Sequence, residues 1–380
     1  MTFFLSFLQS PKKHPIPAYD FWQYYIKNGI TEAGHKWTEC PTIDWALGLV
    51  PKSKESQLQW MEETWQKTVN WLKEHPADLF LSYLYPAQID ITAVNEIKKM
   101  GIPCINFFCD NVREFKKIPI EFSVFDLNWV PEYKAINFYK GAGYPSVNLP
   151  MPMWIEPKLR VVRPETNEQI TFIGSKDIQR QLFFEDVVKQ NAGIPLAIYG
   201  NGWGESTKNQ QPSSVYSIDK KLLYQFDFIK NNGMISYLRK LLQRNAEASD
   251  ILQSKTFGAI SFEAYMQLTA ESMVTVGINR YPSFRFPLDK PDSYSRLRDI
   301  EAPMLGACYL TEWTEGIEEL YEVGKEIEVF KNAGDFIEKI NKLAADAPKR
   351  KSLKLNGQKK ALHDHSVSRS LIKLLNNLMH

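Results

Sequence analysis

Residues 295–311 read S-R-L-R-D-I-E-A-P-M-L-G-A-C-Y-L-T, a charged helical turn followed by a glycine and a short β-rich run. Pro303 limits the helix to a short or kinked segment, because proline lacks a backbone N–H and clashes with the preceding turn. Arg296 and Arg298 at a helix start suit a doubly charged anion, since guanidinium groups and free backbone N–H groups point at it. Glu301, one turn later, is placed to accept hydrogen bonds from a ribose diol. The stretch predicts a nucleotide-diphosphate site; the alternative is an ordinary solvated first turn.

The length and composition indicate a globular protein with more than one domain. The 380 residues exceed what a single core usually supports, so two domains are expected. The hydrophobic content of 44% and the charged content of 24% are ordinary for a folded chain. The formal net charge of +2 argues against broad electrostatic binding to nucleic acid, although it leaves room for a local basic patch.

Four cysteines lie inside apolar runs, with neither metal-ligand spacing nor the density of a disulfide framework. They are Cys40, Cys104, Cys109 and Cys308. Reduced core thiols are typical of cytosolic proteins, so we expect a cytoplasmic location. The apolar run from Thr2 to Leu8 is too short for a signal peptide, and no stretch approaches the ~20 apolar residues of a spanning helix. Any membrane contact is therefore expected to be peripheral.

Strand-like and helix-like segments alternate through residues 1–150. Continuous apolar runs predict strands at Thr2–Leu8, Asp78–Leu84, Ile102–Cys109, Phe125–Val130 and Val147–Leu149. Helical periodicity predicts helices at Tyr19–Ala33, Lys54–His75, Ile89–Met100 and Glu132–Lys140. This alternation is typical of a doubly wound parallel sheet, so residues 1–150 are expected to form an α/β domain.

A second alternation follows a proline-containing break. Four prolines lie between positions 150 and 164, so residues 151–165 are expected to be a linker. In residues 166–362, strands are predicted at Gln169–Ile173, Pro195–Tyr199, Met273–Ile278 and Ala307–Leu310, and helices at Asp177–Gln190, Phe262–Ala270, 314–321 and 334–345. Residues 206–250 are polar and then helical, and are interpreted as an insertion. The pattern predicts two Rossmann-like domains in tandem, with a cleft between them.

Four segments of the second half occur in a set order. They are Q-I-T-F-I-G-S-K-D-I-Q-R (169–180), P-L-A-I-Y-G-N-G-W-G (195–204), A-E-S-M-V-T-V-G-I (270–278) and R-L-R-D-I-E-A-P-M-L-G-A-C-Y-L-T (296–311). With G-K-E-I-E-V-F (324–330) and H-D-H-S-V-S-R (363–369), this order resembles the C-terminal domain of GT-B glycosyltransferases. It looks most like the group 1 type found in spore-maturation-protein-B-like proteins, over roughly residues 168–378. The resemblance implies an α/β GT-B fold, in which two Rossmann-like domains face each other with parallel sheets across a cleft. It also implies that the helix in 363–380, with His363 and His365 in structural roles, packs back toward the N-terminal domain.

The resemblance implies that the second domain binds a nucleotide-sugar donor. Gly174 and Ser175 would end its first strand, where a backbone without a side chain approaches the pyrophosphate. Lys176 and Arg180 follow within a turn and would neutralise the leaving diphosphate, whose charge grows as the sugar–phosphate bond breaks. A capped helix start with a solvated lysine is the alternative for this segment.

Three further segments receive roles from the resemblance. Tyr199 and Gly200 would flank the base at the end of the next strand, unless they form a plain glycine turn. In the family, a carboxylate before an A-x-x-x-G step binds the ribose hydroxyls, and Glu301 occupies that position here, with Arg298 and Arg296 as phosphate or sugar ligands. Many retaining members carry another glutamate eight positions earlier, where this chain has Ser293. That departure leaves open whether the anomeric configuration is retained or inverted.

The first domain is expected to bind the acceptor. Asp110 follows a strand in F-F-C-D-N and is placed to act as the general base that an inverting transferase needs, or to orient substrate in a retaining one. The alternative is an Asx turn that closes the strand. His14 lies in the loop after the first strand, where an acceptor or phosphate contact is implied; a solvated loop histidine is the alternative. Lys12 and Lys13 beside it would attract a phosphorylated acceptor, or are simply solvated.

No His, Cys and Asp cluster has metal-ligand spacing, and there is no D-x-D run, so no metal and no cofactor are expected. GT-B enzymes use basic residues and helix ends instead of a bound cation. The chain is expected to transfer a sugar from a nucleotide-diphosphate donor, with UDP among the candidate carriers, to a hydroxyl of a glycan, protein, lipid or nucleic acid.

Three alternatives stay open. A transferase acting on a hydroxylated DNA base would use a basic strip of Lys12, Lys13, Arg113, Lys116 and Lys117. A non-catalytic protein that binds a nucleotide or glycan would be in keeping with the missing glutamate. A nucleotide-sugar epimerase of the same fold would release no free nucleotide.

Overall fold

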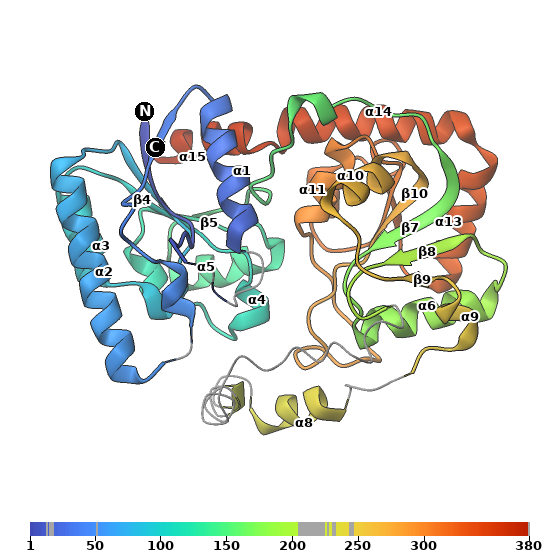
Figure 1. Cartoon of the computed structure of the whole chain (residues 1–380), viewed down its shortest axis with the longest axis horizontal. Coiled ribbons are helices and arrows are strands. Elements are labelled where there is room, and N and C mark those ends of the chain that lie inside the picture. Colours follow the sequence, from blue (N-terminus) through green and yellow to red (C-terminus); the bar gives the residue numbers. More distant parts are fainter. Residues whose placement is uncertain are drawn as a thin grey trace. The chain divides into compact units, whose positions relative to one another are not determined.

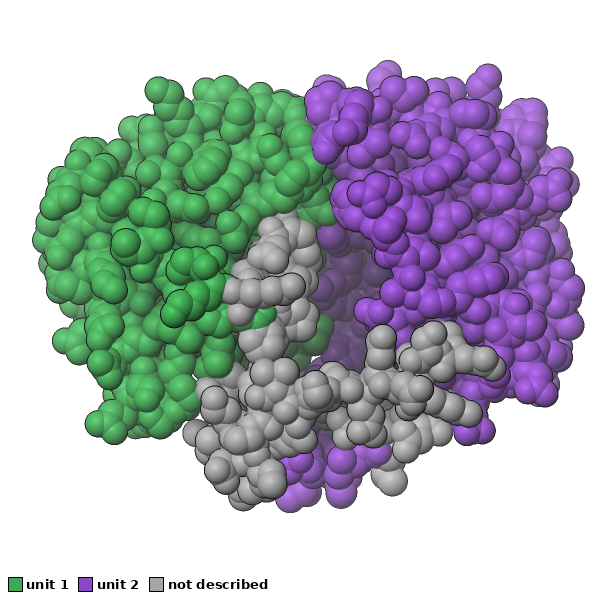
Figure 2. Space-filling model, in the orientation of Figure 1, with its two compact units in different colours: residues 1–154, 216–224, 365–380 green, residues 155–215, 225–364 purple. Residues whose placement is uncertain are grey.

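The computed structural model describes residues 1–12, 14, 19–50, 52–203, 225, 228–229, 233–242 and 247–378. They form two compact units, each described here by itself (Figure 1, Figure 2). Unit 1 contains the described residues of 1–154 and those from 365 onward, and unit 2 contains those of 155–215 and 225–364. The division after Trp154 falls inside the proline-containing segment. Residues just beyond it belong to unit 2, where Glu165 forms an ion pair of 2.9 Å with Arg350.

Unit 1 is built on a six-stranded parallel sheet with the order β2-β1-β3-β4-β5-β6. Its strands are β1 Thr2–Ser6, β2 Lys36–Thr38, β3 Leu79–Ser82, β4 Cys104–Phe107, β5 Leu127–Trp129 and β6 Ser146–Val147. The central strands are apolar on both faces because helices cover both sides, as the continuous apolar runs predict. The strand order reverses between β1 and β3, so the loops after these two strands diverge at the carboxyl edge of the sheet.

The helices of unit 1 include the end of the chain. They are α1 Tyr19–Glu32, α2 Lys54–Glu74, α3 Ile91–Lys99, α4 Asn111–Glu114, α5 Ile136–Ala142 and α15 Val367–Leu378. Helix α15 packs on α1, and a Cβ added to Gly29 of α1 would lie 2.4 Å from the Val367 side chain. Glycine at position 29 therefore lets the last helix approach α1 closely.

Unit 2 is built on a second parallel sheet with the order β12-β11-β10-β7-β8-β9. Its strands are β7 Asn167–Ile173, β8 Leu196–Tyr199, β9 Thr256–Phe257, β10 Ser272–Gly277, β11 Tyr309–Glu312 and β12 Glu328–Phe330. The chain runs outward from β7 to β9, then returns to the other side of β7 to form β10, β11 and β12. This is the strand order of a Rossmann fold, and it places the switch point between β7 and β10.

Helices cover both faces of the second sheet (Figure 1). The helices around this sheet are α6 Ile178–Gln190, α9 Asp250–Gln253, α10 Phe262–Glu271, α11 Leu297–Met304, α12 Ile317–Leu320, α13 Ala333–Ala345 and α14 Ala347–Asp364. Helix α8 Met234–Leu242 also belongs to unit 2 but lies apart from the sheet (Figure 1). Helices α6 and α13 pack together over one face, where Phe183, Phe184 and Phe336 fill the core. Helices α10, α11 and α14 pack over the other.

The structure confirms the predicted alternation of strands and helices but adds elements at the edges. Strands β2, β9 and β12 were not among the predicted strands, and β1 ends at Ser6 rather than Leu8. Of the predicted insertion at 206–250, residues 206–224 and several later ones lie outside the described part; α8 is described, and α9 begins at Asp250. No helix in the described ranges is long and apolar enough to cross a bilayer.

Candidate active site

A cavity of about 380 Å³ opens at the carboxyl edge of the second sheet. Its walls are the loops after β7, β8 and β9, the first turn of α10 and one residue of α11. The lining residues are Ile173, Gly174, Ser175, Gly200, Asn201, Ala259, Ile260, Ser261, Phe262, Tyr265 and Arg298. This is the edge at which open α/β sheets bind ligands. Four of the predicted donor-site residues thus line one cavity: Gly174, Ser175, Gly200 and Arg298.

The two glycine loops are braced against each other. Gly200 has a φ of 139°, and a Cβ added to it would lie 2.3 Å from the carbonyl oxygen of Gly174. The Gly174 N–H donates to the Tyr199 carbonyl at 2.8 Å, and the Lys176 N–H donates to the Asn201 carbonyl at 2.8 Å. Glycine at position 200 is therefore required by the neighbouring loop, a reason that the sequence pattern did not supply.

The aromatic residues of the second loop pack within unit 2. The Tyr199 ring stacks on Phe257 of β9 with a centroid distance of 4.9 Å. Trp203 is buried, and its indole N–H donates to the Gly174 carbonyl at 2.8 Å. Lys176 lies with its ammonium 5.9 Å from the Trp203 ring. The structure thus shows Trp203 fixing the loop after β7, and Tyr199 contacting the adjacent strand, beside the position predicted for the base.

Arg180 ties together the ends of the two strands at the switch point. Its guanidinium donates to the Ser175 carbonyl at 2.8 Å and to the Ile278 carbonyl at 3.1 Å, and lies 3.3 Å from Asp177. The predicted leaving-group cation is therefore held by backbone carbonyls after β7 and β10. Its position is fixed before any ligand binds.

Arg298 presents a guanidinium to the cavity wall. Its guanidinium carbon lies 5.2 Å from the centroid of the Tyr265 ring, in a cation–π arrangement. Its Nη1 is buried and has no hydrogen-bond acceptor within the described part of the chain. Arg296, by contrast, donates to the Tyr294 hydroxyl and is not among the lining residues. Of the two arginines in the R-L-R motif, the structure brings Arg298 to the cavity.

The three guanidinium groups influence one another. Burial lowers the pKa of Arg180, and the nearby Arg298 and Arg296 lower it further, against the opposing effect of Asp177. Burial also acts to lower the pKa of Arg298, but Tyr265 and Glu301 help to raise it above its ordinary value. The site concentrates positive charge, and mutual repulsion of this kind is relieved when an anion binds.

The helix start that lines the cavity is that of α10. Ser261 caps it, with its hydroxyl accepting the Ala264 N–H at 3.2 Å, and Phe262 opens the helix. The remaining N–H groups of a first turn have no intrahelical acceptor, and the helix dipole favours an anion there. The anion was predicted at the start of α11, whose Arg298 also lines the cavity, whereas no role was predicted for the start of α10. At the start of α11, the Arg296 N–H donates to the Asp299 carboxylate at 2.9 Å. Ser261 directly before the predicted helix Phe262–Ala270 is an N-cap signal, and it could have indicated this helix start from the sequence.

Glu301 lies behind the cavity wall. It is 3% exposed and accepts a hydrogen bond from the hydroxyl of Tyr265, which lines the cavity. The resemblance implies that this carboxylate contacts a ribose, and one of its oxygens, Oε2, already accepts from Tyr265. In the described structure, Glu301 therefore positions Tyr265, whose ring lies against the Arg298 guanidinium.

Asp299 anchors α11 from within the core. Its carboxylate accepts hydrogen bonds from Tyr309 at 2.6 Å, Thr311 at 3.0 Å and Asn279 at 3.2 Å. Burial raises its pKa, although these partners act to lower it. The network attaches the start of α11 to β11 and fixes the direction in which Arg298 leaves the helix.

The position of the missing family glutamate is structural in this chain. Ser293 forms an isolated antiparallel bridge with Arg280 and accepts the Thr314 hydroxyl at its carbonyl, 2.7 Å away. The Arg280 guanidinium forms an ion pair of 2.6 Å with Glu312. The hydrogen bonds around Ser293 thus connect the segment before α11 to the end of β11.

The acceptor-side predictions fall on unit 1. His14 lies in the loop after β1, with Nε2 2.8 Å from the Asp44 carboxylate. Lys12 is exposed, and Lys13 lies outside the described residues. This contact holds the His14 ring in a fixed orientation against Asp44.

Asp110 directly follows β4 and is 9% exposed. The predicted alternative for it, an Asx turn, is not what the structure shows at α4. Glu132 accepts the N–H groups of Asn111 and Val112, and the Asp110 side chain makes no capping bond. Burial raises the pKa of Tyr83, at the end of β3, well above its usual value, and Cys109 and Asp110 contribute. Asp110 therefore belongs to a polar cluster at the carboxyl edge of the first sheet.

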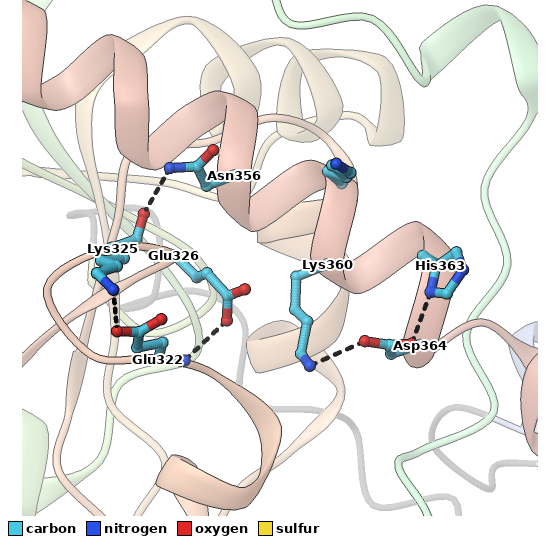
Figure 3. A pocket seen from close by; sticks show the side chains of 8 residues that line it. Glu322, Lys325, Glu326, Asn356, Lys360, His363 and Asp364 are labelled. Carbon is cyan, nitrogen blue, oxygen red and sulfur yellow. Dashed lines mark hydrogen bonds and ion pairs between the residues drawn. The ribbon is translucent and has the colours of Figure 1, made fainter.

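A second hollow in unit 2 is occupied by paired charges. It lies between α14 and the turn before β12, and Lys325, Lys360 and His363 all face acidic partners there (Figure 3). Lys325 lies 2.5 Å from Glu322, while Lys360 and His363 both contact Asp364, at 2.8 and 2.7 Å. His363 is exposed and His365 is buried. Within the described ranges, no group of three or more His, Cys, Asp or Glu side chains could hold a metal ion.

Comparisons with known proteins agree with this architecture. The profile of the glycosyl transferase-like family matches residues 179–376, just over half of the chain. A glycosyltransferase from Rickettsia africae is similar in structure, with a TM-score of 0.60, 11% identity, and coverage of 99% of this chain and 97% of the other. Sucrose-phosphate synthase from Thermosynechococcus elongatus gives a TM-score of 0.57 at 11% identity, with coverage of 100% and 98%. HepE from Anabaena, in complex with UDP-glucose, gives a TM-score of 0.57 at 12% identity, with coverage of 99% of this chain and 98% of HepE. These likenesses show the GT-B fold, and no curated protein matches the sequence.

Proposed function

Because the chain belongs to the glycosyl transferase-like family, we propose that it transfers a sugar from a nucleotide-diphosphate donor to an acceptor hydroxyl. The donor occupies the cavity of unit 2 and the acceptor binds to unit 1. Within the family, we assign the chain to the spore-maturation-protein-B-like group, on the motif order of residues 168–378.

The observation that carries the donor assignment is Arg298, which lines the cavity and whose buried Nη1 has no hydrogen-bond acceptor among the described residues. A buried donor without an acceptor is costly, so the site is built for an acceptor that arrives with the ligand. Phosphate oxygens fit this need, since the start of α10 lines the same cavity. Arg180 adds positive charge behind the loop after β7.

The chemistry follows from this charge distribution. When the bond between sugar and diphosphate breaks, negative charge accumulates on the departing phosphate. Fixed cations at Arg298 and Arg180 stabilise that charge more than they stabilise the intact donor, so they lower the barrier. This supports a reaction in which arginines and a helix end act on the leaving group and no metal takes part.

The acceptor hydroxyl must lose a proton as it attacks. We assign Asp110 as the group that accepts it or orients the hydroxyl, and His14, with Asp44 behind it, as an acceptor or phosphate contact. UDP is the proposed carrier, because HepE, which shares the fold, has been captured with UDP-glucose. The cytosolic location stays a prediction that rests on the four buried thiols.

The test is a thermal-shift screen against UDP, GDP, TDP, CDP and ADP, with monophosphates as controls. A ligand at about 100 times its dissociation constant should add about 2.7 kcal/mol of stability. The selected diphosphate then defines the sugar screen, in which release of free nucleotide reports turnover. Asp110→Asn should lower kcat while leaving the diphosphate shift unchanged.

Three outcomes would change the assignment. Binding of a diphosphate without turnover of any sugar would favour a non-catalytic protein. Conversion of the donor sugar without release of nucleotide would favour an epimerase. Binding of DNA that weakens steeply with salt would direct the acceptor search to nucleic acid. The absence of a shift with every nucleotide would refute the donor site.

A further inference from the structure

Helix α8 presents an apolar stripe to solvent. Its exposed apolar side chains are Met234 at 55%, Ile235 at 69%, Leu238 at 49% and Leu241 at 44%. At 3.6 residues per turn these four positions span an arc of about 120° on one side of the helix. Single exposed apolar residues are common on protein surfaces, but a contiguous stripe along a helix marks an interaction surface.

The ring contact that is described between α8 and unit 2 lies beside the stripe and not within it. Tyr237 lies outside the arc, and its ring packs 6.3 Å from Phe228. Phe228 in turn makes an edge contact of 5.0 Å with Phe284 of unit 2. The side of α8 that carries Tyr237 thus contacts the unit, while the four side chains of the stripe are each between 44% and 69% exposed.

The charge around α8 indicates what covers the stripe. Residues 228–246 contain four basic residues and no acidic one. Arg239 lies on α8 itself, about 40° beyond Ile235 at the border of the arc. An apolar arc with Arg239 at its border, within a segment whose sequence is basic, fits the surface of a bilayer. There, acyl chains take up the apolar side chains and anionic headgroups pair with the basic ones.

We propose that α8 docks the protein on a membrane surface that contains anionic lipids. The helix lies flat at the interface, with Met234, Ile235, Leu238 and Leu241 inserted between headgroups. This surface is separate from the donor cavity, so the inference does not depend on the proposed reaction.

The experiment is co-sedimentation of the full chain with vesicles. One set contains phosphatidylcholine alone, and the other contains phosphatidylcholine with a third of phosphatidylglycerol. The double variant Ile235→Gln with Leu238→Gln should lower the partition coefficient for the anionic vesicles at least about tenfold. Each of the two substitutions removes a large apolar side chain that the bilayer would bury. The matched control is Leu182→Gln with Leu355→Gln, which alters two leucines of similar exposure, 45% and 48%, on α6 and α14. The control should bind as the unmodified chain does.

Several results would overturn the proposal. One is failure of the unmodified chain to sediment with anionic vesicles at moderate salt. A second is equal loss of binding in both double variants, and a third is equal binding to both vesicle types. If the unmodified chain does not bind vesicles and the stripe variant elutes from gel filtration with a different oligomeric state, a second copy of the chain covers the stripe. Unchanged melting temperatures establish that both variants fold.

Discussion

Replacing Arg298 by methionine tests how the cavity recognises a diphosphate. Methionine keeps most of the side-chain length and removes the charge and all the donors. Arg298 lines the cavity, and its Nη1 has no hydrogen-bond acceptor among the described residues. The variant should therefore lose at least one charge-assisted hydrogen bond to the ligand. Such a bond contributes about 1.5–3 kcal/mol, which corresponds to an affinity loss of roughly 10- to 150-fold.

The neighbouring arginine provides the comparison. The Arg296 guanidinium donates to the Tyr294 hydroxyl and does not line the cavity. Its substitution by methionine removes only a screened charge from the surroundings, so we expect the affinity to change by no more than about threefold. The two variants differ in position by two residues and are identical in chemistry.

Titration calorimetry with the nucleoside diphosphate selected by the thermal screen, and with its parent nucleoside, measures the effect. Arg298→Met should weaken the diphosphate and leave the nucleoside unchanged. The variant also removes the positive charge of Arg298 that interacts with the buried Glu301, which lowers stability. Adding Glu301→Gln should restore the melting temperature but not the affinity. Equal losses for Arg296→Met and Arg298→Met, or an equal loss for nucleoside and diphosphate, would refute the reasoning.

Three further perturbations test other features of the structure. Gly200→Ala places a Cβ 2.3 Å from the Gly174 carbonyl oxygen at a φ of 139°, so the melting temperature should fall by roughly 5–15 °C. The control is Gly258→Ala, where the added atom meets open space and the melting temperature should change little. Equal falls in the two variants would contradict the close approach of Gly200 to Gly174. Burial raises the pKa of Cys308 to about 12, so at pH about 8 this thiol should be alkylated over a thousandfold more slowly than an ordinary cysteine. Mass spectrometry of the native chain after alkylation measures the rate. A rate within about tenfold of that of glutathione would show that the thiol is accessible. The hydrogen bond from Lys360 holds the pKa of Asp364 at about 2. The carboxylate therefore stabilises the fold above its unfolded pKa of about 3.9, and this stabilisation is lost as the pH falls toward 2. The urea midpoint should depend less on acid pH in Asp364→Asn than in the unmodified chain, and an unchanged dependence would mean that Asp364 does not cause it.

The interior of both sheets could be predicted because buried parallel strands leave a strong local signal. Residues 104–107 and 272–277 are buried throughout, and such apolar runs have few other interpretations. The edge strands have no such signal. Thr256–Phe257 is two residues long and half open to solvent, and its assignment depends on pairing with β8. Pairing is a property of the fold, so no window of sequence around β9 contains it.

The same distinction separates the predicted cavity residues from the missed ones. Gly174 and Gly200 each follow a strand, and parallel strands bring their carboxyl ends to one edge, so their convergence follows from local patterns. Tyr265 joins Glu301 across 36 positions of the chain. Helical periodicity places Arg298 and Glu301 on one face of α11, but it does not indicate which of them reaches solvent and which packs beneath Tyr265.

The buried carboxylates Glu301 and Asp299 explain how the site holds several arginines close together. The pKa of Arg298 is raised, despite burial, by Tyr265, Glu301, Tyr309 and Asp299, so these groups stabilise its charged form before any anion arrives. The pKa of Arg180 is lowered by burial and by the two neighbouring guanidiniums, although Asp177 and Tyr294 act to raise it. An incoming diphosphate therefore has unequal effects: Arg298 gains hydrogen bonds, and Arg180 gains relief from repulsion. A cation whose charged form is already stabilised by buried carboxylates is in place when charge develops on the leaving group, and this is the condition under which electrostatic stabilisation lowers a barrier most.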